Sequence, residues 1–454
     1  MFTKSENFNP NYLASIVKID NIRKHSNADR LQIATIYGNN VITGLAAQIG
    51  QIYCYFPLES CLSFEFLSYT NSFRDAELNS DTTKKSLFEK HGRIRACSLR
   101  GEKSEGYIIP VSELENFAKD ILGKKISIDD SFVGTDFDMF FDHMLCKKYI
   151  PANQRTPNVA GSKKSKGNVK KYVSKLVENQ FRFHEDTQAL KRNIHLVNPN
   201  DYIAITNKLH GSNFIVSNVL VKRKLSIRDR IAKFFGATVQ ESEYGNLYAS
   251  RTVIKNKNFE TINSTGHFYD ADVWKIASDR LFPFLKEGIS VTGELVGFTP
   301  SGKAIQPLYD YGVPPGELDL YVFKVTYTSP SGDVFVFNHA QLLDWCKKYD
   351  IKTPQTFYYG KAKDLFPELD TENHWHQNFL QKLQDTYLEK KCDICKNDVW
   401  AEGVVLRLDY PHSWNALKLK SWNFLGYESA QLDSNNTGVD SDENQSEELT
   451  EQVE

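Results

Sequence analysis

The sequence lacks any uninterrupted apolar stretch approaching the roughly 18 residues that a membrane-spanning helix needs. No segment at its start resembles a secretory signal peptide, and its seven cysteines are an odd number scattered along 454 residues. This usage argues against a disulfide framework and favours a reducing compartment. We therefore expect a soluble, intracellular, cytoplasmic protein, long enough for two or three domains that each bury a core.

The spacing of the cysteines gives little indication of a metal site. The chain's one Cys-x-x-Cys pair is formed by Cys392 and Cys395. Tetrahedral zinc needs four ligands, and no second close pair of Cys or His accompanies these two thiols. We expect two free thiols here, although metal binding stays open as an alternative.

Positive charge and aromatic rings are both absent from residues 431–454, which hold eight Asp or Glu. A polar, acidic segment of this composition cannot bury enough apolar surface to become ordered. We expect residues 429–454 to form a disordered acidic tail, which leaves the rest of the chain mildly basic.

The N-terminal third contains short runs of β-branched and aromatic residues, at 12–20 and 31–37, separated by polar turn residues. This spacing is typical of small barrels and sandwiches, and "HSNADRLQIATI" resembles the opening of OB-type barrels that bind tRNA and other nucleic acids. We expect residues 1–145 to form an OB-like, nucleic-acid-binding β-barrel. Four cations of segment 92–110 could contact phosphates, although a solvated basic hairpin explains them equally well: Arg93, Arg95, Arg100 and Lys103.

Residues 146–180 are polar and rich in lysine, glycine and serine, which predicts a basic linker. Such a charge run is more often a solvated connection than a phosphate contact. From residue 181 onward, alternating apolar strands return between helical patterns. We expect residues 181–428 to form an α+β domain built on antiparallel sheet.

The segment "ITNKLHGSNF", residues 205–214, places Lys208 at the end of an apolar run. A lysine at the mouth of a buried strand is costly to desolvate and shifts its pKa readily, so the position suits an amine nucleophile. The alternative is a strand-end lysine that extends into solvent.

Later segments supply the groups that an amine nucleophile acting on a nucleotide would need. Arg251 can fork onto a ribose or phosphate, and a ring of Tyr321 or Phe323 could stack on a purine. Glu402 is a hard oxygen ligand suited to Mg²⁺. Lys418 and Lys420 alternate along one strand and therefore point the same way.

The order of these groups is more specific than any one of them. "KLHGSNF", "SRT", "GELVG", "LYVFKV", "EGVVLR" and "LKLKS" resemble motifs I, Ia, III, IIIa, IV and V of ATP-dependent RNA ligases of the RNA ligase 2 type. The resemblance spans roughly residues 181–425 and identifies that domain as a covalent nucleotidyltransferase. Some bacterial ligases that resemble this chain also carry an OB module before the transferase domain.

The resemblance implies an ATP-dependent RNA ligase that uses Mg²⁺ or Mn²⁺ and acts in three steps. These are lysine attack on the ATP α-phosphate, transfer of AMP to an RNA 5′-phosphate, and attack by a 3′-OH that expels AMP. The expected substrate is a nicked RNA duplex or the ends of a broken structured RNA, joined by a monomer in RNA repair. The expected RNA contact is the N-terminal barrel, with no role for it in the ATP step.

The resemblance also assigns roles to individual residues. Lys208 is the expected catalytic nucleophile, and Glu402 is the expected metal ligand. Nucleotide contacts are expected from seven further residues: His210, Gly211, Arg251, Glu294, Phe323, Lys418 and Lys420. Two alternatives remain, namely another lysyl nucleotidyltransferase such as a DNA ligase or capping guanylyltransferase, and a non-catalytic RNA-binding protein. The absence of an OB-sized segment after "LKLKS" argues against the first, and the complete motif set argues against the second.

Overall fold

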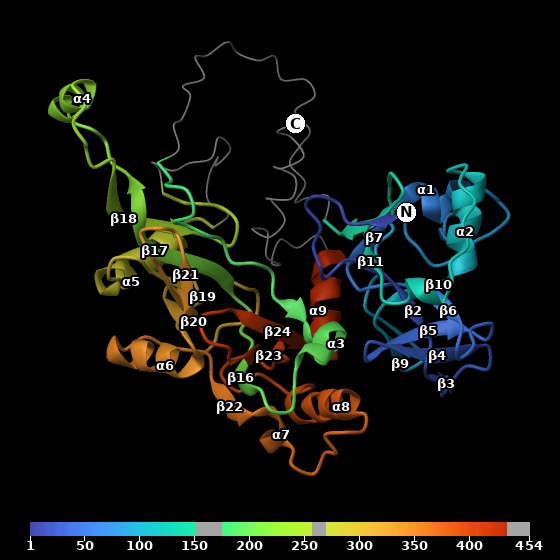
Figure 1. The fold of residues 1–454 in the computed structure, drawn as a ribbon. Helices are drawn as coiled ribbons and strands as arrows, with labels where there is room; N and C mark the ends of the chain where they lie inside the picture. Colours follow the sequence, from blue (N-terminus) through green and yellow to red (C-terminus); the bar gives the residue numbers. More distant parts are fainter. Residues whose placement is uncertain (151–174, 257–268, 434–454) are drawn as a thin grey trace.

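The computed structural model describes residues 1–150, 175–256 and 269–433. Residues 151–174 of the predicted linker and 434–454 of the predicted tail lie outside this part of the chain. The N-terminal module, residues 1–150, contains mostly very short strands and two helices (Figure 1). Its elements are β1 (Phe2–Thr3), β2 (Ala14–Lys18), β3 (Ile22–Lys24), β4 (Leu31–Ile36), β5 (Asn39–Gly44), β6 (Ile52–Phe56), β7 (Ser60–Leu62), α1 (Phe64–Tyr69), β8 (Cys97–Leu99), β9 (Glu102–Ser104), β10 (Tyr107–Pro110), α2 (Val111–Asp120), β11 (Asp136–Phe137), β12 (Met139–Phe140), β13 (His143–Met144) and β14 (Cys146–Lys148).

These strands form several small antiparallel sheets, and within residues 1–150 they do not close into the predicted barrel. The largest has the order β10-β6-β2-β11, and β3-β4-β5 forms a separate meander. Closure of a barrel requires every strand to pair on both sides, and many strands here are only two or three residues long. The apolar core gathers instead under α1 and α2, where Phe56, Phe66 and Phe117 are completely buried.

The rest of the described chain is the transferase module, residues 175–433. Its elements are β15 (Gln188–Ala189), α3 (Leu190–Asn193), β16 (Tyr202–Asn207), β17 (Ser212–Lys222), α4 (Ile227–Phe234), β18 (Ser242–Ala249), α5 (Val273–Leu281), β19 (Ile289–Gly297), β20 (Leu318–Thr328), β21 (Val334–Val336), α6 (His339–Lys348), β22 (Thr356–Lys361), α7 (Ala362–Leu365), α8 (Trp375–Tyr387), β23 (Gly403–Leu408), β24 (Asn415–Lys420) and α9 (Trp422–Asp433).

Two five-stranded sheets organise the transferase module. One has the order β18-β17-β19-β20-β21 and is entirely antiparallel, with α5 packed on it through Trp274. The other has the order β15-β24-β23-β16-β22, and its core packs against α8 through Phe379. Because β16 leads directly into β17, the chain passes from one sheet to the other at residues 208–211 (Figure 1). The predicted α+β class with antiparallel sheets is confirmed.

The module boundaries differ from those expected. Cys146–Lys148 form β14, which pairs with β7, so the start of the predicted linker belongs to the N-terminal module. Near its end, Leu176 bridges to Val221, and the Gln180 side chain donates a hydrogen bond to Ser329 O. Residues 429–433, expected in the disordered tail, complete α9, which lies between the two modules (Figure 1). No helix of the described residues is long and apolar enough to cross a membrane.

Candidate active site

Lys208 lies directly after β16, at the crossing between the two sheets. Its backbone N–H donates to Gly403 O at 3.0 Å, which continues the pairing of β16 with β23. This register places Lys208 beside Glu402, and Lys208 Nζ lies 2.7 Å from Glu402 Oε1. The Lys208 side chain is 23% exposed and lines the cavity, so it is mostly buried but accessible from there.

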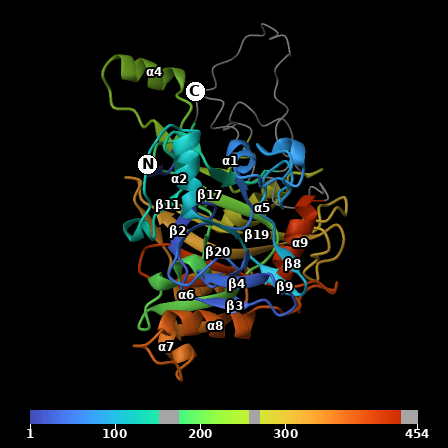
Figure 2. The ribbon, with the colours of Figure 1, turned by 90° about the vertical axis from the view of Figure 1, so that its right-hand side faces the viewer.

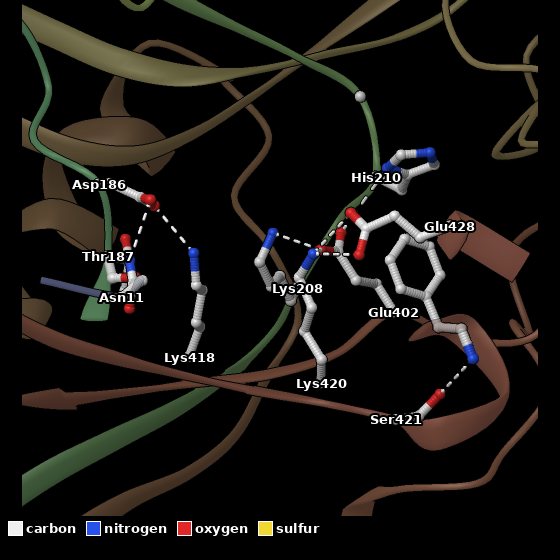
Figure 3. Close-up of polar contacts among 12 residues, drawn as sticks. Asn11, Asp186, Thr187, Lys208, His210, Glu402, Lys418, Lys420, Ser421 and Glu428 are labelled. Carbon is white, nitrogen blue, oxygen red and sulfur yellow. Dashed lines mark hydrogen bonds and ion pairs between the residues drawn. The ribbon is translucent and has the colours of Figure 1, made fainter. Parts of the chain in front are cut away.

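Glu402 is held between two lysines in the interior (Figure 3). Lys420 Nζ is 3.3 Å from Glu402 Oε1 and 2.8 Å from Glu428 Oε1 of α9. Burial alone would raise the pKa of Glu402, but the charges of Lys208 and Lys420 lower it to about 2. Burial would lower the pKa of Lys420, yet Glu428 and Glu402 raise it above its ordinary value. Both groups are therefore charged near neutral pH.

Lys418 forms a second charged group with a carboxylate that the sequence did not indicate. Lys418 Nζ lies 2.8 Å from Asp186 Oδ1 (Figure 3). Arg251 Nη2 lies 3.3 Å from the same oxygen. Burial lowers the pKa of Lys418 to about 8, against the opposing effect of Asp186. Asp186 precedes β15, whose parallel pairing with β24 opposes Ala189 to Lys418. No motif marks this aspartate, because only that pairing brings it to the site.

His210 and Gly211 shape the crossing segment. The His210 ring packs edge-on against Tyr309 and Phe424, with Nδ1 3.9 Å from Glu402 Oε2. A Cβ on Gly211 would lie only 2.2 Å from Leu295 O. Glycine is thus required by the close approach of β19.

The predicted nucleotide and metal residues meet in one cavity of about 180 Å³. Its lining includes eight of the nine predicted residues: Lys208, His210, Arg251, Glu294, Phe323, Glu402, Lys418 and Lys420. Gly211 is the one predicted residue that is not part of the lining. Tyr321, the other candidate for stacking, packs instead in an apolar cluster with Leu209 and Tyr311, and only Phe323 reaches the cavity.

An aromatic wall surrounds Phe323. The His184 ring lies 5.2 Å and the Trp414 ring 6.0 Å from the Phe323 ring, measured between centroids. Burial lowers the pKa of His184 well below its ordinary value, so this ring is neutral. Neither His184 nor Trp414 belongs to a recognised motif, and both were missed because they reach Phe323 only in the folded chain.

The N-terminal module also contributes to the cavity, which the sequence did not indicate. Tyr12, Glu59, Lys148 and Tyr149 line it together with Lys208. Asn11 Nδ2 donates to Asp186 Oδ2 at 2.9 Å, which joins the module to the Lys418 group. The cavity is therefore composite.

The four cations that could contact phosphate or form a solvated hairpin have partners within the protein. The Arg93 side chain is fully buried, with Nε 2.6 Å from Glu59 Oε2 and Nη1 2.8 Å from Asp433 Oδ1. A guanidinium enclosed in this way fastens α9 to the N-terminal module and is not open to RNA. The other three lie nearer the surface: Arg95 pairs with Asp433, Arg100 donates to Asn27 O, and Lys103 lies over the Trp422 ring.

The carboxylates of the cavity are the groups that could bind a divalent metal. Within residues 1–150, 175–256 and 269–433, no three or more His, Cys, Asp or Glu side chains cluster in a way suited to a metal. Cys392 and Cys395 are among these residues and belong to no such cluster. Glu402 Oε2 is buried without a hydrogen bond, so it can offer one oxygen. Mg²⁺ commonly takes one or two carboxylates and completes its shell with water and substrate phosphates, and the site fits that mode.

Residues 201–420 match the RNA ligase family. No curated protein gives a significant match. An RNA ligase of Naegleria gruberi with a lysine-to-alanine substitution, solved with ATP and Mn, superposes with a TM-score of 0.55 at 14% identity, over 93% of this chain and 99% of that chain.

Two further structures of the Naegleria gruberi RNA ligase give the same result. A second lysine-to-alanine variant with ATP and Mn has a TM-score of 0.54 at 16% identity, over 91% of this chain and 98% of that chain. A lysine-to-methionine variant with AMP and Mn has a TM-score of 0.52, with the same identity and coverage. The superpositions show a shared fold, and the family match covers the segment from β16 to Lys420. Residues 201–420 are therefore similar to the RNA ligase family, and the chain shares the fold of the RNA ligase structures.

Proposed function

We propose that the protein is an ATP-dependent RNA ligase that adenylylates itself on Lys208 and joins RNA 3′-OH and 5′-phosphate ends. The observation that carries this proposal is the position of Lys208 Nζ, 2.7 Å from a buried carboxylate and in one cavity with Lys418 and Lys420. The related ligase structures were solved with ATP and Mn or with AMP and Mn, which supports the same ligands here.

In the first step, the Lys208 amine attacks the α-phosphorus of ATP. A nitrogen–phosphorus bond forms, the bond from the α-phosphorus to the α–β bridging oxygen breaks, and pyrophosphate leaves as the amine gives up its proton to solvent. Glu402 orients the amine, and because its pKa is about 2 it serves as a fixed charge rather than as a proton acceptor. Lys418 and Lys420 stabilise the negative charge that builds on the phosphoryl oxygens.

The walls of the cavity suit the rest of the nucleotide. Phe323 and Trp414 are proposed to offer flat apolar faces to adenine. Arg251 and Glu294 line the same cavity and are proposed to bond the ribose hydroxyls. Glu402 Oε2 would hold Mg²⁺ or Mn²⁺, which when bound adds positive charge beside the transferring phosphoryl group.

The later steps reuse the same groups. An RNA 5′-phosphate oxygen attacks the phosphorus of lysyl-AMP, which restores the Lys208 amine and gives an RNA with a 5′-adenylate. The 3′-OH of the second end then attacks the RNA 5′-phosphorus, so that a phosphodiester forms and AMP leaves. Lys418 and Lys420 are placed to stabilise charge in both transfers, because both line the cavity that holds the AMP phosphate in each step.

The remaining expectations are part of this proposal. We take the substrate to be a nicked duplex or the ends of a broken structured RNA, joined by a monomer during repair. The N-terminal module, expected to be OB-like, is proposed to bind RNA in addition to lining the cavity with Glu59 and Lys148. Residues 434–454 are proposed to be a disordered acidic tail.

The experiment that tests the proposal follows label into the protein. The full chain is incubated with ATP labelled on the α- or the γ-phosphate and a divalent metal, and then analysed on a denaturing gel. We expect covalent label from α-labelled ATP alone, and its transfer to an RNA 5′-phosphate on addition of nicked RNA. An adduct with GTP or NAD instead of ATP would point to another lysyl nucleotidyltransferase, and no adduct with any of the three would overturn the enzymatic assignment.

A further inference from the structure

Helix α4 projects from the body of the transferase module, beyond the ends of β17 and β18 (Figures 1 and 2). It begins with a capping box in which Ser226 and Asp229 exchange hydrogen bonds, and none of its residues is buried. An eight-residue helix is marginal in water, so this one is held by its cap and by its flanking hairpin rather than by packing. We call residues 222–243 the α4 arm.

One side of α4 is apolar and fully open. Ile227, Ile231, Phe234 and Phe235 expose 76%, 53%, 85% and 80% of their surfaces. At 3.6 residues per turn, these four positions occupy an arc of about 100°. The two phenylalanine rings meet edge to face, at 5.4 Å and 84°, which leaves flat ring surfaces open to a partner. A contiguous exposed patch of this kind marks an interaction surface.

Positive charge borders the apolar arc. By the same helical geometry, Arg230 lies about 40° beyond Phe234 at one edge of the arc, and Arg228 lies about 20° beyond Phe235 at the other edge. Arg223 pairs with Asp229, and Lys233 pairs with Glu241. Within the described chain, no acidic side chain pairs with the other four cations of the arm: Lys222, Lys224, Arg228 and Arg230.

Cations beside open aromatic faces match the chemistry of unpaired RNA, in which phosphates meet Lys or Arg and bases stack on aromatic rings. A second copy of the arm is a poor occupant, because its like charges would repel across a small contact. An anionic membrane could also bind an apolar and cationic surface of this kind. Membrane binding would not explain why the arm extends from β17, the strand that begins four residues after Lys208.

We propose that the α4 arm binds an unpaired segment of the RNA substrate at a distance from the joining site. The inference rests on the proposed function, and it adds a contact site for one region of the RNA. Strand β17 has 11 residues, so the arm lies about 35 Å from Lys208 at roughly 3.3 Å per residue. An RNA must therefore extend several nucleotides beyond the joining site to reach it.

Fluorescence anisotropy with single-stranded RNA of 6 and 24 nucleotides, in the absence of ATP, tests the proposal on the full chain. Phe234→Ala/Phe235→Ala and Arg228→Ala/Arg230→Ala should each bind the 24-nucleotide RNA at least about 10-fold more weakly, since each stacked base contributes about 1–3 kcal/mol. Binding of the 6-nucleotide RNA should change by less than about twofold. The arginine variant should also lower the slope of log affinity against log salt by about 1.4, from two lost phosphate contacts on a single strand.

Matched controls remove an equivalent group elsewhere on the surface. Phe357→Ala removes an exposed phenylalanine, and Lys347→Ala/Lys348→Ala removes two exposed cations of α6. Both should bind the 24-nucleotide RNA as the parent chain does. Self-adenylylation should be unchanged in every variant. If the parent chain itself forms no adduct, the proposed function is contradicted, but the anisotropy measurements still test whether the arm binds RNA.

Three outcomes would overturn the proposal. One is unchanged binding of the 24-nucleotide RNA by both arm variants, and another is an equal loss for the two RNA lengths. The third is sedimentation of the parent chain, but not of the phenylalanine variant, with vesicles of 70% phosphatidylcholine and 30% phosphatidylglycerol while RNA affinity stays constant. That result would assign the arm to an anionic membrane instead.

Discussion

Lys208 and Glu402 face each other at neighbouring ends of β16 and β23, with Nζ 2.7 Å from Oε1. The carboxylate is 3% exposed and also carries Lys420 at 3.3 Å. One buried negative charge thus orients the proposed nucleophile and one of the two proposed phosphate-binding lysines. The first steps of catalysis and the stability of this region should both depend on that single carboxylate.

Replacing Lys208 by Ala or Arg should abolish the covalent adduct with α-labelled ATP. Alanine removes the amine, and a guanidinium remains protonated near neutral pH and cannot attack phosphorus. Gel autoradiography measures the adduct, with Lys347→Ala as a control that should label normally. Label that survives in either Lys208 variant would move the nucleophile to another residue.

The burial that lowers the pKa of Lys418 to about 8 should appear in the pH dependence of adenylylation. Above pH 8 the free enzyme loses this positive charge, so kcat/KM for ATP should fall relative to that of Lys418→Arg. Arginine keeps its charge, so its profile should lack this fall up to about pH 9.5. Parallel profiles for the two proteins between pH 7 and 9.5 would show that the Lys418 charge does not govern ATP capture.

The depressed pKa of Glu402 predicts a loss of stability in acid. Its folded-state pKa is about 2 and its ordinary value is 4.5, so ionisation contributes about 3 kcal/mol at neutral pH. This contribution is fully present above pH 4.5 and declines as the pH falls toward 2. Urea unfolding should show Glu402→Gln less stable than the parent chain at pH 7, with a gap that narrows below pH 4.5. A gap independent of pH would contradict the assignment.

Arg93 should be essential for holding the N-terminal module against α9. Arg93→Ala leaves Glu59 buried without its partner, and we expect a loss of about 3–5 kcal/mol in the free energy of unfolding. The Asp433 side chain is 39% exposed, so Asp433→Ala should cost less than about 1 kcal/mol. Denaturant unfolding of both variants gives the comparison, and equal losses would show that Arg93 acts mainly through Asp433.

Removal of the N-terminal module should slow self-adenylylation as well as RNA joining. Tyr12, Glu59, Lys148 and Tyr149 line the cavity, so a fragment of residues 150–454 loses part of the wall around ATP. We expect its adenylylation rate to fall at least about 10-fold, and Lys148→Ala in the full chain to show a smaller decrease. A folded fragment that adenylylates at the full rate would restrict the module to the RNA steps, as the sequence alone suggested.

The sequence by itself determined the chemistry of the cavity. Local alternation singled out Lys208, Glu402, Lys418 and Lys420 beside apolar strands. The order of the motifs that contain them, which resembles that of RNA ligases, supplied their expected roles. The α+β class followed from the same alternation. These features depend on residues within a few positions of one another.

Only the tertiary structure decided the partners of those groups. Asp186 reaches Lys418 through the pairing of β15 with β24, and Trp414 reaches Phe323 from a loop outside every motif. Arg93 resembled a surface cation but is enclosed by Glu59 and Asp433. Contacts between residues that are far apart in sequence depend on strand register and module docking, and a local pattern does not encode them. The free energy of burying a charge is set by those contacts, so the roles of these residues became clear only in the folded chain.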